Sequence, residues 1–80
     1  MRSFMIFDVR PGFEEWVISV LKKDRNVKRI YVIAGEHDLI SIVDFPDYDS
    51  LYNWLLEMRR VQGVEHIKSY IVIDMSSKGK

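Results

Sequence analysis

The sequence predicts a single α+β domain made of two consecutive β-α-β units, and three observations lead to this fold class. Apolar, β-prone runs occupy residues 4–9, 27–34, 39–45 and 64–74. Two amphipathic stretches lie between them, one after the first run and one after the third. Each amphipathic stretch is entered through a proline, Pro11 or Pro46, that follows the end of a predicted strand. The two halves of the chain therefore repeat one strand–helix–strand pattern.

Two stretches have the residue spacing of an amphipathic helix. The first covers about residues 13–24, and its apolar face comprises Phe13, Trp16, Val17, Val20 and Leu21. The second begins after Asp47, which can cap its N-terminus, and ends before Gly63. Its apolar residues are Leu51, Leu55 and Met58. Basic pairs near the end of each helix complement the helix dipole, so we do not read them as a binding patch.

This order of elements is typical of the split β-α-β, ferredoxin-like fold. The short turn at 35–38 makes the second and third strands an antiparallel hairpin. Right-handed crossovers place both helices on one face of a four-stranded sheet with the order 4-1-3-2. We expect residues 1–75 to form the domain and residues 76–80 to be a flexible tail.

The face of the sheet opposite the helices is also predicted to be apolar. Side chains alternate across a strand, so Phe4 and Ile6 oppose Met5, Phe7 and Val9, and Ile40 and Ile42 oppose Leu39, Val43 and Phe45. Both faces are therefore largely apolar, and the two helices can cover only one of them. An 80-residue chain without cysteine has little besides packing to stabilise it. We therefore expect a dimer that packs sheet against sheet and covers this face.

Composition and motifs narrow the class of function. The 12 basic and 12 acidic residues cancel, which does not suggest direct nucleic-acid binding. No apolar run reaches the roughly 20 residues of a membrane span, and nothing resembles a signal peptide, so we expect a cytoplasmic location. The two histidines, His37 and His66, are too scattered for a metal cluster. No nucleophile or phosphate-loop motif is present, and we expect no catalytic residue, metal or cofactor.

The turn Gly35-Glu36-His37-Asp38 has two interpretations. In an ordinary hairpin, glycine supplies a positive φ and Asp38 caps backbone N–H groups. In a ligand-binding loop, exposed N–H groups hold a carboxylate and the aspartate holds an ammonium. The second combination would suit a free amino acid.

These residues together resemble the effector-binding domain, called RAM, of the Lrp/AsnC transcription regulators. Ala34-Gly35-Glu36-His37-Asp38 is close to the T-G-x-Y/H-D turn of that family. Pro11-Gly12 matches its P-G before the first helix, and Gln62-Gly63-Val64 is similar to its P-G-V before the last strand. The resemblance covers essentially the whole chain. It implies a stand-alone form without the helix-turn-helix of full-length members.

The resemblance also implies a function that residue spacing does not. Members pair through their sheets, assemble as rings of dimers, and bind amino acids between dimers. Many members carry two hydroxyl residues on the last strand, and here Ser69 keeps one while Ile67 departs from the pattern. We therefore expect non-catalytic amino-acid binding and oligomerisation, with full-length Lrp/AsnC regulators as further partners. The ligand-binding residues carried over are Gly35, Glu36, His37 and Asp38 of one subunit with Ile67 and Ser69 of a neighbour.

Two alternatives stay open from the sequence. A small dimeric ferredoxin-like enzyme of the monooxygenase or isomerase type would need a titrating group such as His66 or Asp44 in a pocket between sheet and helices. A purely structural assembly module would have lost its ligand site, and Ile67 favours that interpretation.

Overall fold

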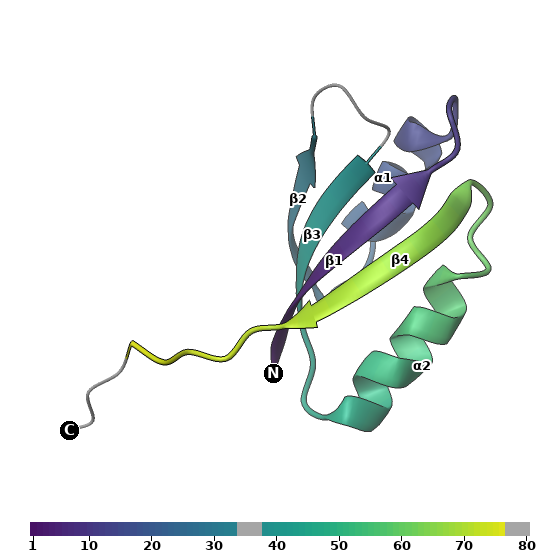
Figure 1. The fold of residues 1–80 in the computed structure, drawn as a ribbon. Helices are drawn as coiled ribbons and strands as arrows, with labels where there is room; N and C mark the ends of the chain where they lie inside the picture. The colour runs from purple at the N-terminus through teal and green to yellow at the C-terminus, as the bar shows by residue number, and fades with distance from the viewer. Residues whose placement is uncertain (34–37, 77–80) are drawn as a thin grey trace.

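The structure, a computed structural model, describes residues 1–33 and 38–76. Its elements are β1 (Arg2–Val9), α1 (Glu14–Lys22), β2 (Val27–Val32), β3 (Asp38–Asp44), α2 (Tyr48–Met58) and β4 (Val64–Ile71). The sheet has the order β2-β3-β1-β4 with antiparallel neighbours throughout. Both helices lie on one side of it (Figure 1). The predicted α+β class and the order 4-1-3-2 are confirmed.

The core lies between this sheet and the helices. The sheet side of the core comprises Met5, Phe7 and Val9 of β1, Leu39 and Val43 of β3, and Phe45 just after β3. The helix side comprises Val17 and Leu21 of α1 and Leu51, Trp54 and Met58 of α2. The Trp54 ring meets the rings of Phe7 and Phe45 edge-on, with centroids 6.2 and 5.5 Å apart. Trp16 is 53% exposed, so the prediction that it joins the apolar helix face is wrong.

The N-terminus of α2 forms as predicted. The Asp47 Oδ1 atom accepts the backbone N–H of Ser50 at 2.8 Å, which satisfies one of the free donors of the first turn. The role of Asp47 as N-cap is therefore confirmed.

Two turns that are distant in sequence pack against each other beside the sheet. Gly63 has φ +95°, and a Cβ there would overlap Phe13, whose Cγ lies 2.7 Å from the Cβ position. The backbone N–H of Arg10 donates to the Gly63 carbonyl at 2.7 Å. Glycine is thus needed both for the left-handed backbone and for the close approach of the loop before α1.

The last strand is shorter than predicted. β4 ends at Ile71 rather than near residue 74, because β1 begins at Arg2, whose carbonyl accepts the N–H of Val72 at 2.9 Å. Residues 73–75 have no neighbouring strand and continue the line of β4 away from the sheet (Figure 1). Ile73 is 75% exposed and Met75 is 84% exposed. The predicted tail 76–80 lies outside the described residues from 77 onward.

Candidate functional site

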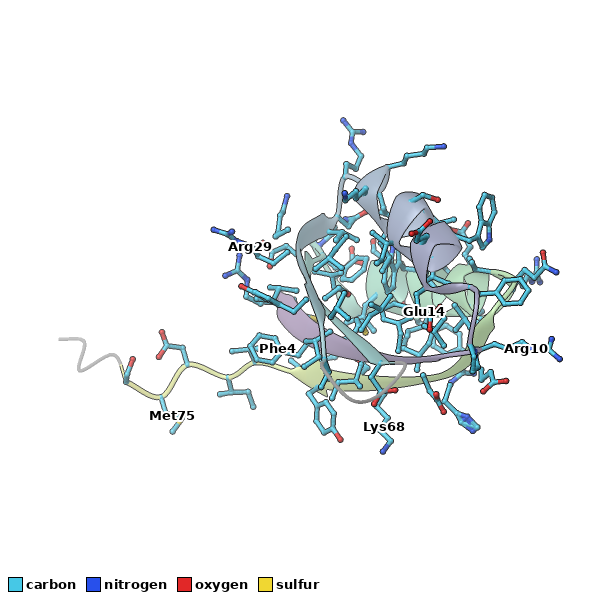
Figure 2. The ribbon with its side chains drawn as sticks, turned by 90° about the horizontal axis from the view of Figure 1, so that it is seen from above. Phe4, Arg10, Glu14, Arg29, Lys68 and Met75 are labelled. Carbon is cyan, nitrogen blue, oxygen red and sulfur yellow. The ribbon has the colours of Figure 1, made fainter. Side chains whose placement is uncertain are left out.

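The face of the sheet turned away from the helices, called here the open face, has an apolar centre. Strand alternation places Phe4 and Ile6 of β1 beside Ile40 and Ile42 of β3 on this face. Phe4 is 42% exposed, and the flanking Tyr31 and Tyr70 are half-exposed. Seen along the sheet, Lys68 also points away from the helices (Figure 2). Helices cover one face of the sheet, so this apolar surface is open to solvent in the single chain.

Strand register divides the open face into four rows that run across the sheet. The rows are Asp38–Asp8–His66, then Tyr31–Ile40–Ile6–Lys68, then Arg29–Ile42–Phe4–Tyr70, and last Asp44–Arg2. Carboxylates therefore lie at both ends of the face, but of the two end rows only the last contains a guanidinium.

The first row borders a hollow of 270 Å³. Its lining residues are Ile6, Asp8, Asp38, His66 and Lys68. Asp8 and Asp38 are direct cross-strand partners, and neither side chain has a hydrogen bond or ion pair with another described residue. Like charges in directly opposite positions destabilise a strand pair, so this arrangement has a cost. The two carboxylates can hold a cationic group, such as an ammonium, more easily than an anion.

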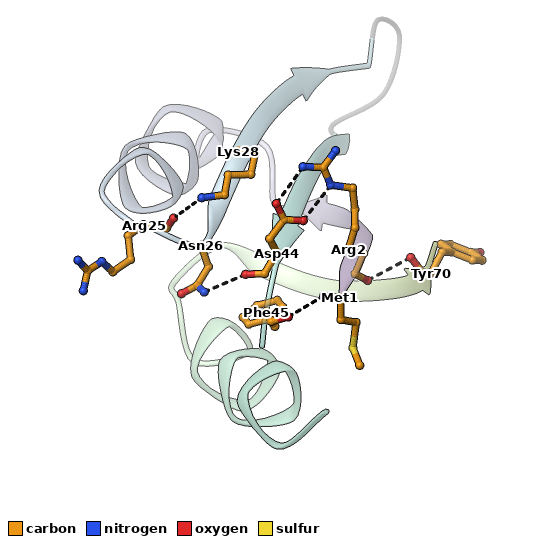
Figure 3. A network of polar contacts seen from close by, with 9 residues as sticks. Met1, Arg2, Arg25, Asn26, Lys28, Asp44, Phe45 and Tyr70 are labelled. Atoms are coloured by element: carbon orange, nitrogen blue, oxygen red, sulfur yellow. Dashed lines mark hydrogen bonds and ion pairs between the residues drawn. The ribbon is translucent and has the colours of Figure 1, made fainter. Parts of the chain in front are cut away.

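The last row contains a bidentate ion pair between Arg2 and Asp44. Arg2 Nε lies 2.8 Å from Asp44 Oδ1, and Nη2 lies 2.9 Å from Oδ2 (Figure 3). The hydrogen bond from Arg2 lowers the pKa of the Asp44 carboxyl and raises the pKa of the guanidinium. Lys28 and the chain N-terminus add smaller favourable charges that also lower the pKa of Asp44. At this end of the open face, the charges of Arg2 and Asp44 are thus already paired with each other.

Of the residues predicted to bind a ligand, the three that the structure describes are not brought together within one chain. Gly35, Glu36 and His37 lie outside the described residues. Asp38 opens β3 on the open face and is half-buried. Ile67 and Ser69 lie on β4 with their side chains on the opposite, helix-bearing side of the sheet. A ligand that touches Asp38 and also Ile67 or Ser69 therefore requires β4 from a second copy.

The two β4 positions differ in their surroundings. Ile67 is half-buried and packs against the core. Ser69 is exposed, and its Oγ lies 3.1 Å from the Oγ of Ser3. A hollow of 380 Å³ lies along β4 next to Ile67. It is lined by Arg59, Val64, Glu65, His66, Ile67 and Lys68. β4 is an edge strand, so this hollow is accessible to another chain.

The two titrating groups considered for an enzyme, His66 and Asp44, do not lie between the sheet and the helices. His66 is exposed on the open face, and Asp44 is paired with Arg2 on the same face. Within residues 1–33 and 38–76, the buried polar side chains are Ser3 and Ser41. The same residues contain no group of three His, Asp or Glu side chains that could hold a metal ion. Neither described helix is long and apolar enough to cross a membrane.

Sequence reasoning did not group Asp8, His66 and Lys68 with Asp38. The signal that could have found them is strand parity, because Asp8 and Lys68 share the parity of Phe4 and Tyr70 on their strands. The register of β1 against β4, which brings His66 beside Asp8, involves residues distant in sequence.

Comparison with known proteins defines the class of the chain. Residues 8–79 match the model of the Lrp/AsnC ligand binding domain. The chain belongs to this family, which confirms the resemblance seen in its turns. A curated relative is an uncharacterized HTH-type transcriptional regulator of Pyrococcus abyssi, 25% identical over 56 residues. The match covers 70% of this chain and 38% of that protein, so the chain spans well under half of its curated relative.

Solved structures share the fold closely. The crystal structure of FFRP-DM1 is 27% identical, with a TM-score of 0.84 over 90% of this chain and 97% of that chain. Hypothetical protein PHS023 from Pyrococcus horikoshii is 27% identical, with a TM-score of 0.79 over 100% and 99%. A transcriptional regulator from Neisseria meningitidis, solved as a complex with L-Met, is 18% identical with a TM-score of 0.82 over 95% and 51%. The last likeness shows the fold alone.

Proposed function

We propose that the chain is a non-catalytic effector module that binds a free amino acid and modulates transcription regulators of the Lrp/AsnC family. The family match over residues 8–79 carries this proposal, because it is a match to a ligand-binding domain. The carboxylate of Asp38, at the start of β3, also supports it, because it has no hydrogen bond or ion pair with another described residue. Full-length relatives are the partners whose DNA binding would respond.

The ligand site uses two copies of the chain. Asp38 holds the ammonium of the amino acid, and backbone N–H groups of Gly35, Glu36 and His37 hold its carboxylate. Ile67 and Ser69 of another copy contact the ligand from the edge of β4. Ile67 replaces a polar contact by an apolar one, which favours an effector with an apolar side chain. The N. meningitidis regulator was crystallised with L-Met, an amino acid of that kind.

The chain also self-associates through the open face, and dimers formed in this way join further into a ring. The apolar centre of the open face supports this part of the proposal, because soluble monomers rarely leave a contiguous patch of this kind uncovered. Assembly between dimers then brings Asp38 of one copy near β4 of another.

A purely structural assembly module is the second candidate. The observation that favours it is the packing of Ile67 against the core of its own chain, which leaves less of that side chain for a ligand. This candidate predicts the same dimer and no response to amino acids.

A thermal-shift screen of the twenty amino acids at millimolar concentration tests the proposal. A ligand present at 100 times its Kd stabilises the folded state by about 2.7 kcal/mol, which raises the melting temperature of a domain this small by roughly 10–20 °C. We expect one or a few amino acids with apolar side chains to raise the melting temperature.

Asp38→Asn should abolish that shift, since it removes the charge and keeps the shape. Asp49→Asn, on the exposed first turn of α2, is the matched control and should respond like the wild type. If no amino acid shifts the wild-type protein, ligand binding is wrong and the structural module remains.

A further inference from the structure

Positive charge is concentrated where α1 ends and β2 begins. Of the 12 basic residues, five lie within positions 22–29, and the same stretch contains one acidic residue, Asp24. The five are Lys22, Lys23, Arg25, Lys28 and Arg29. The zero net charge of the chain therefore conceals a strongly basic corner.

The two carboxylates beside this corner are engaged with other partners. Both side-chain oxygens of Asp24 accept hydrogen bonds, one from the Trp54 indole and one from the backbone of Asn26. Asp44 is held by the bidentate contact with Arg2, and Lys28 has a smaller effect on the pKa of Asp44 than Arg2 has. The positive charge of the corner is therefore not neutralised by these two acids.

An irregularity of β2 directs Lys28 toward this corner. The register of β2 against β3 shifts between Val27 and Arg29, so Lys28 has no partner on β3. A bulge of this kind changes the direction of a side chain. The Lys28 ammonium donates to the Arg25 carbonyl at 3.2 Å (Figure 3). Its charge thus lies beside the turn that leads from α1 into β2.

A hollow of 350 Å³ lies between the end of α1 and the start of β2. It is lined by Leu21, Lys22, Val27, Lys28, Arg29 and Ile30. Unlike the two hollows described above, it has no acidic lining residue. Val27 and Ile30 are half-buried and pack against the core, so they give the hollow an apolar floor. The side chains of Lys22 and Arg29 are exposed and have no hydrogen bond or ion pair with another described residue.

Two structural roles account for only part of this arrangement. The helix dipole favours Lys22 and Lys23 at the end of α1, but Lys28 and Arg29 belong to a strand. Cations on an edge strand discourage pairing with another strand, and Arg29 lies at the outer edge of the sheet (Figure 2). Neither role needs cations from two elements around an apolar hollow.

We propose that this hollow binds a nucleoside phosphate. Lys22 and Lys28 hold the phosphate groups, and the base lies on Val27 and Ile30 beside the Arg29 guanidinium. Ammonium groups bind phosphate through charge-assisted hydrogen bonds, and a guanidinium plane stacks on a base. The volume is within the usual range of small-ligand sites. The backbone of a nucleic acid would use the cations but leave the apolar floor without a partner.

This hollow is separate from the proposed amino-acid site. Val27 pairs with Val43, which is five residues from Asp38 along β3, or roughly 17 Å. A free amino acid is a zwitterion without net charge, so it does not need a site lined by three cations. The nucleotide site goes beyond the proposed function, and the failure of either site leaves the other unaffected.

Isothermal titration calorimetry with adenosine triphosphate tests the proposal, with a chelator present so that no metal ion neutralises the phosphates. The double variant Lys22→Gln, Lys28→Gln should raise the Kd roughly 10- to 100-fold, because it removes charge-assisted hydrogen bonds. Arg29 is kept because it also borders the open face. Pyrophosphate and adenosine, which each supply part of the ligand, should bind more weakly than adenosine triphosphate.

The double variant Arg10→Gln, Arg60→Gln is the matched control. It removes the same number of positive charges from exposed side chains outside the hollow, so it should bind adenosine triphosphate like the wild type. Both double variants should keep the wild-type melting temperature, because all four side chains are exposed.

Three results would overturn the nucleotide site. The first is a wild-type protein that binds no adenosine triphosphate at millimolar concentration. The second is an equal loss of affinity in the two double variants, or no loss in either, since the hollow would then not hold the phosphates. The third is a DNA duplex of random sequence that binds through Lys22 and Lys28 when adenosine triphosphate does not. That last outcome would assign the cations to a nucleic-acid backbone instead.

Discussion

The indole N–H of Trp54 on α2 donates to Asp24 Oδ2, at the end of α1, over a distance of 2.6 Å. The other oxygen of that carboxylate accepts the backbone N–H of Asn26 at 2.8 Å. Trp54 is 5% exposed and packs between Phe7 and Phe45. One side chain therefore joins the second helix, the turn before β2 and the core of the sheet.

Replacing Trp54 by Phe should lower the free energy of unfolding by about 1–3 kcal/mol, since it removes the hydrogen bond to Asp24 and part of the buried ring. Urea unfolding followed by circular dichroism measures the change. Trp16→Phe is the matched control, because Trp16 is half-exposed, and it should change stability by less than about 0.5 kcal/mol. Equal losses for the two variants would contradict the role assigned to Trp54.

The two buried serines of the sheet should respond in opposite ways to replacement by alanine. Ser3 Oγ has partners in Ser69 Oγ and the Tyr70 carbonyl, both at 3.1 Å, whereas Ser41 Oγ has no hydrogen-bond partner among the described residues. Ser3→Ala should cost about 1 kcal/mol, and Ser41→Ala should be neutral or stabilise by about 1 kcal/mol. Chemical denaturation of the two variants is the measurement. A clear loss of stability in Ser41→Ala would show that the hydroxyl has a partner after all.

Two glycines with nearly the same backbone angle should tolerate alanine differently. Gly12 has φ +96° with nothing within 4 Å of its Cβ position, and Gly63 has φ +95° with Phe13 in that place. Gly12→Ala should cost about 1–2 kcal/mol, the usual penalty of a left-handed residue with a Cβ. Gly63→Ala should cost more, because Phe13 must also move. Comparable melting temperatures for the two variants would refute the steric part of this argument.

Asp47 should make the stability of α2 depend on pH in the acid range. Its hydrogen bonds with Ser50 lower the pKa of the folded-state carboxyl below its usual value of about 4. A group with a lower pKa in the folded state stabilises the fold above that usual value, and the contribution is lost as pH falls through the folded-state pKa. Asp47→Asn keeps the cap but does not titrate, so its melting temperature should fall less steeply than that of the wild type between about pH 5 and pH 2. Parallel curves would contradict the prediction.

Most of the fold was predictable because it depends on local patterns. Helical spacing, the N-cap at Asp47 and the glycine stop at Gly63 each involve residues within a few positions of one another. The errors arose where a distant partner decides the outcome. Ile73 is β-prone but does not extend β4, because the hydrogen bonds to β1 that this strand needs end with the bond from Val72 to the Arg2 carbonyl. Trp16 has the spacing of the apolar helix face, but it is half-exposed, and the helix buries Val17 and Leu21 instead.

The candidate site was less predictable for a similar reason. Asp38 could be singled out from its turn, which is a local motif. The neighbours of Asp38 on the open face depend on the registers of β3 and β4 against β1. The second of these registers shifts at an irregularity between Asp8 and Val9. A shift of this kind changes which side chains meet across strands, and residue spacing does not reveal it.

The hydrogen bond from Val72 to the Arg2 carbonyl has a consequence for the connectivity of the domain. It places the beginning and the end of the folded unit side by side, so the backbone is already nearly a closed ring. A short peptide could join the two ends, and the ring could be opened between β2 and β3 instead. The second β-α-β unit would then come first and the interlocking of the two units would be preserved. The order of the elements along the chain and their arrangement in space are thus separable for this small domain.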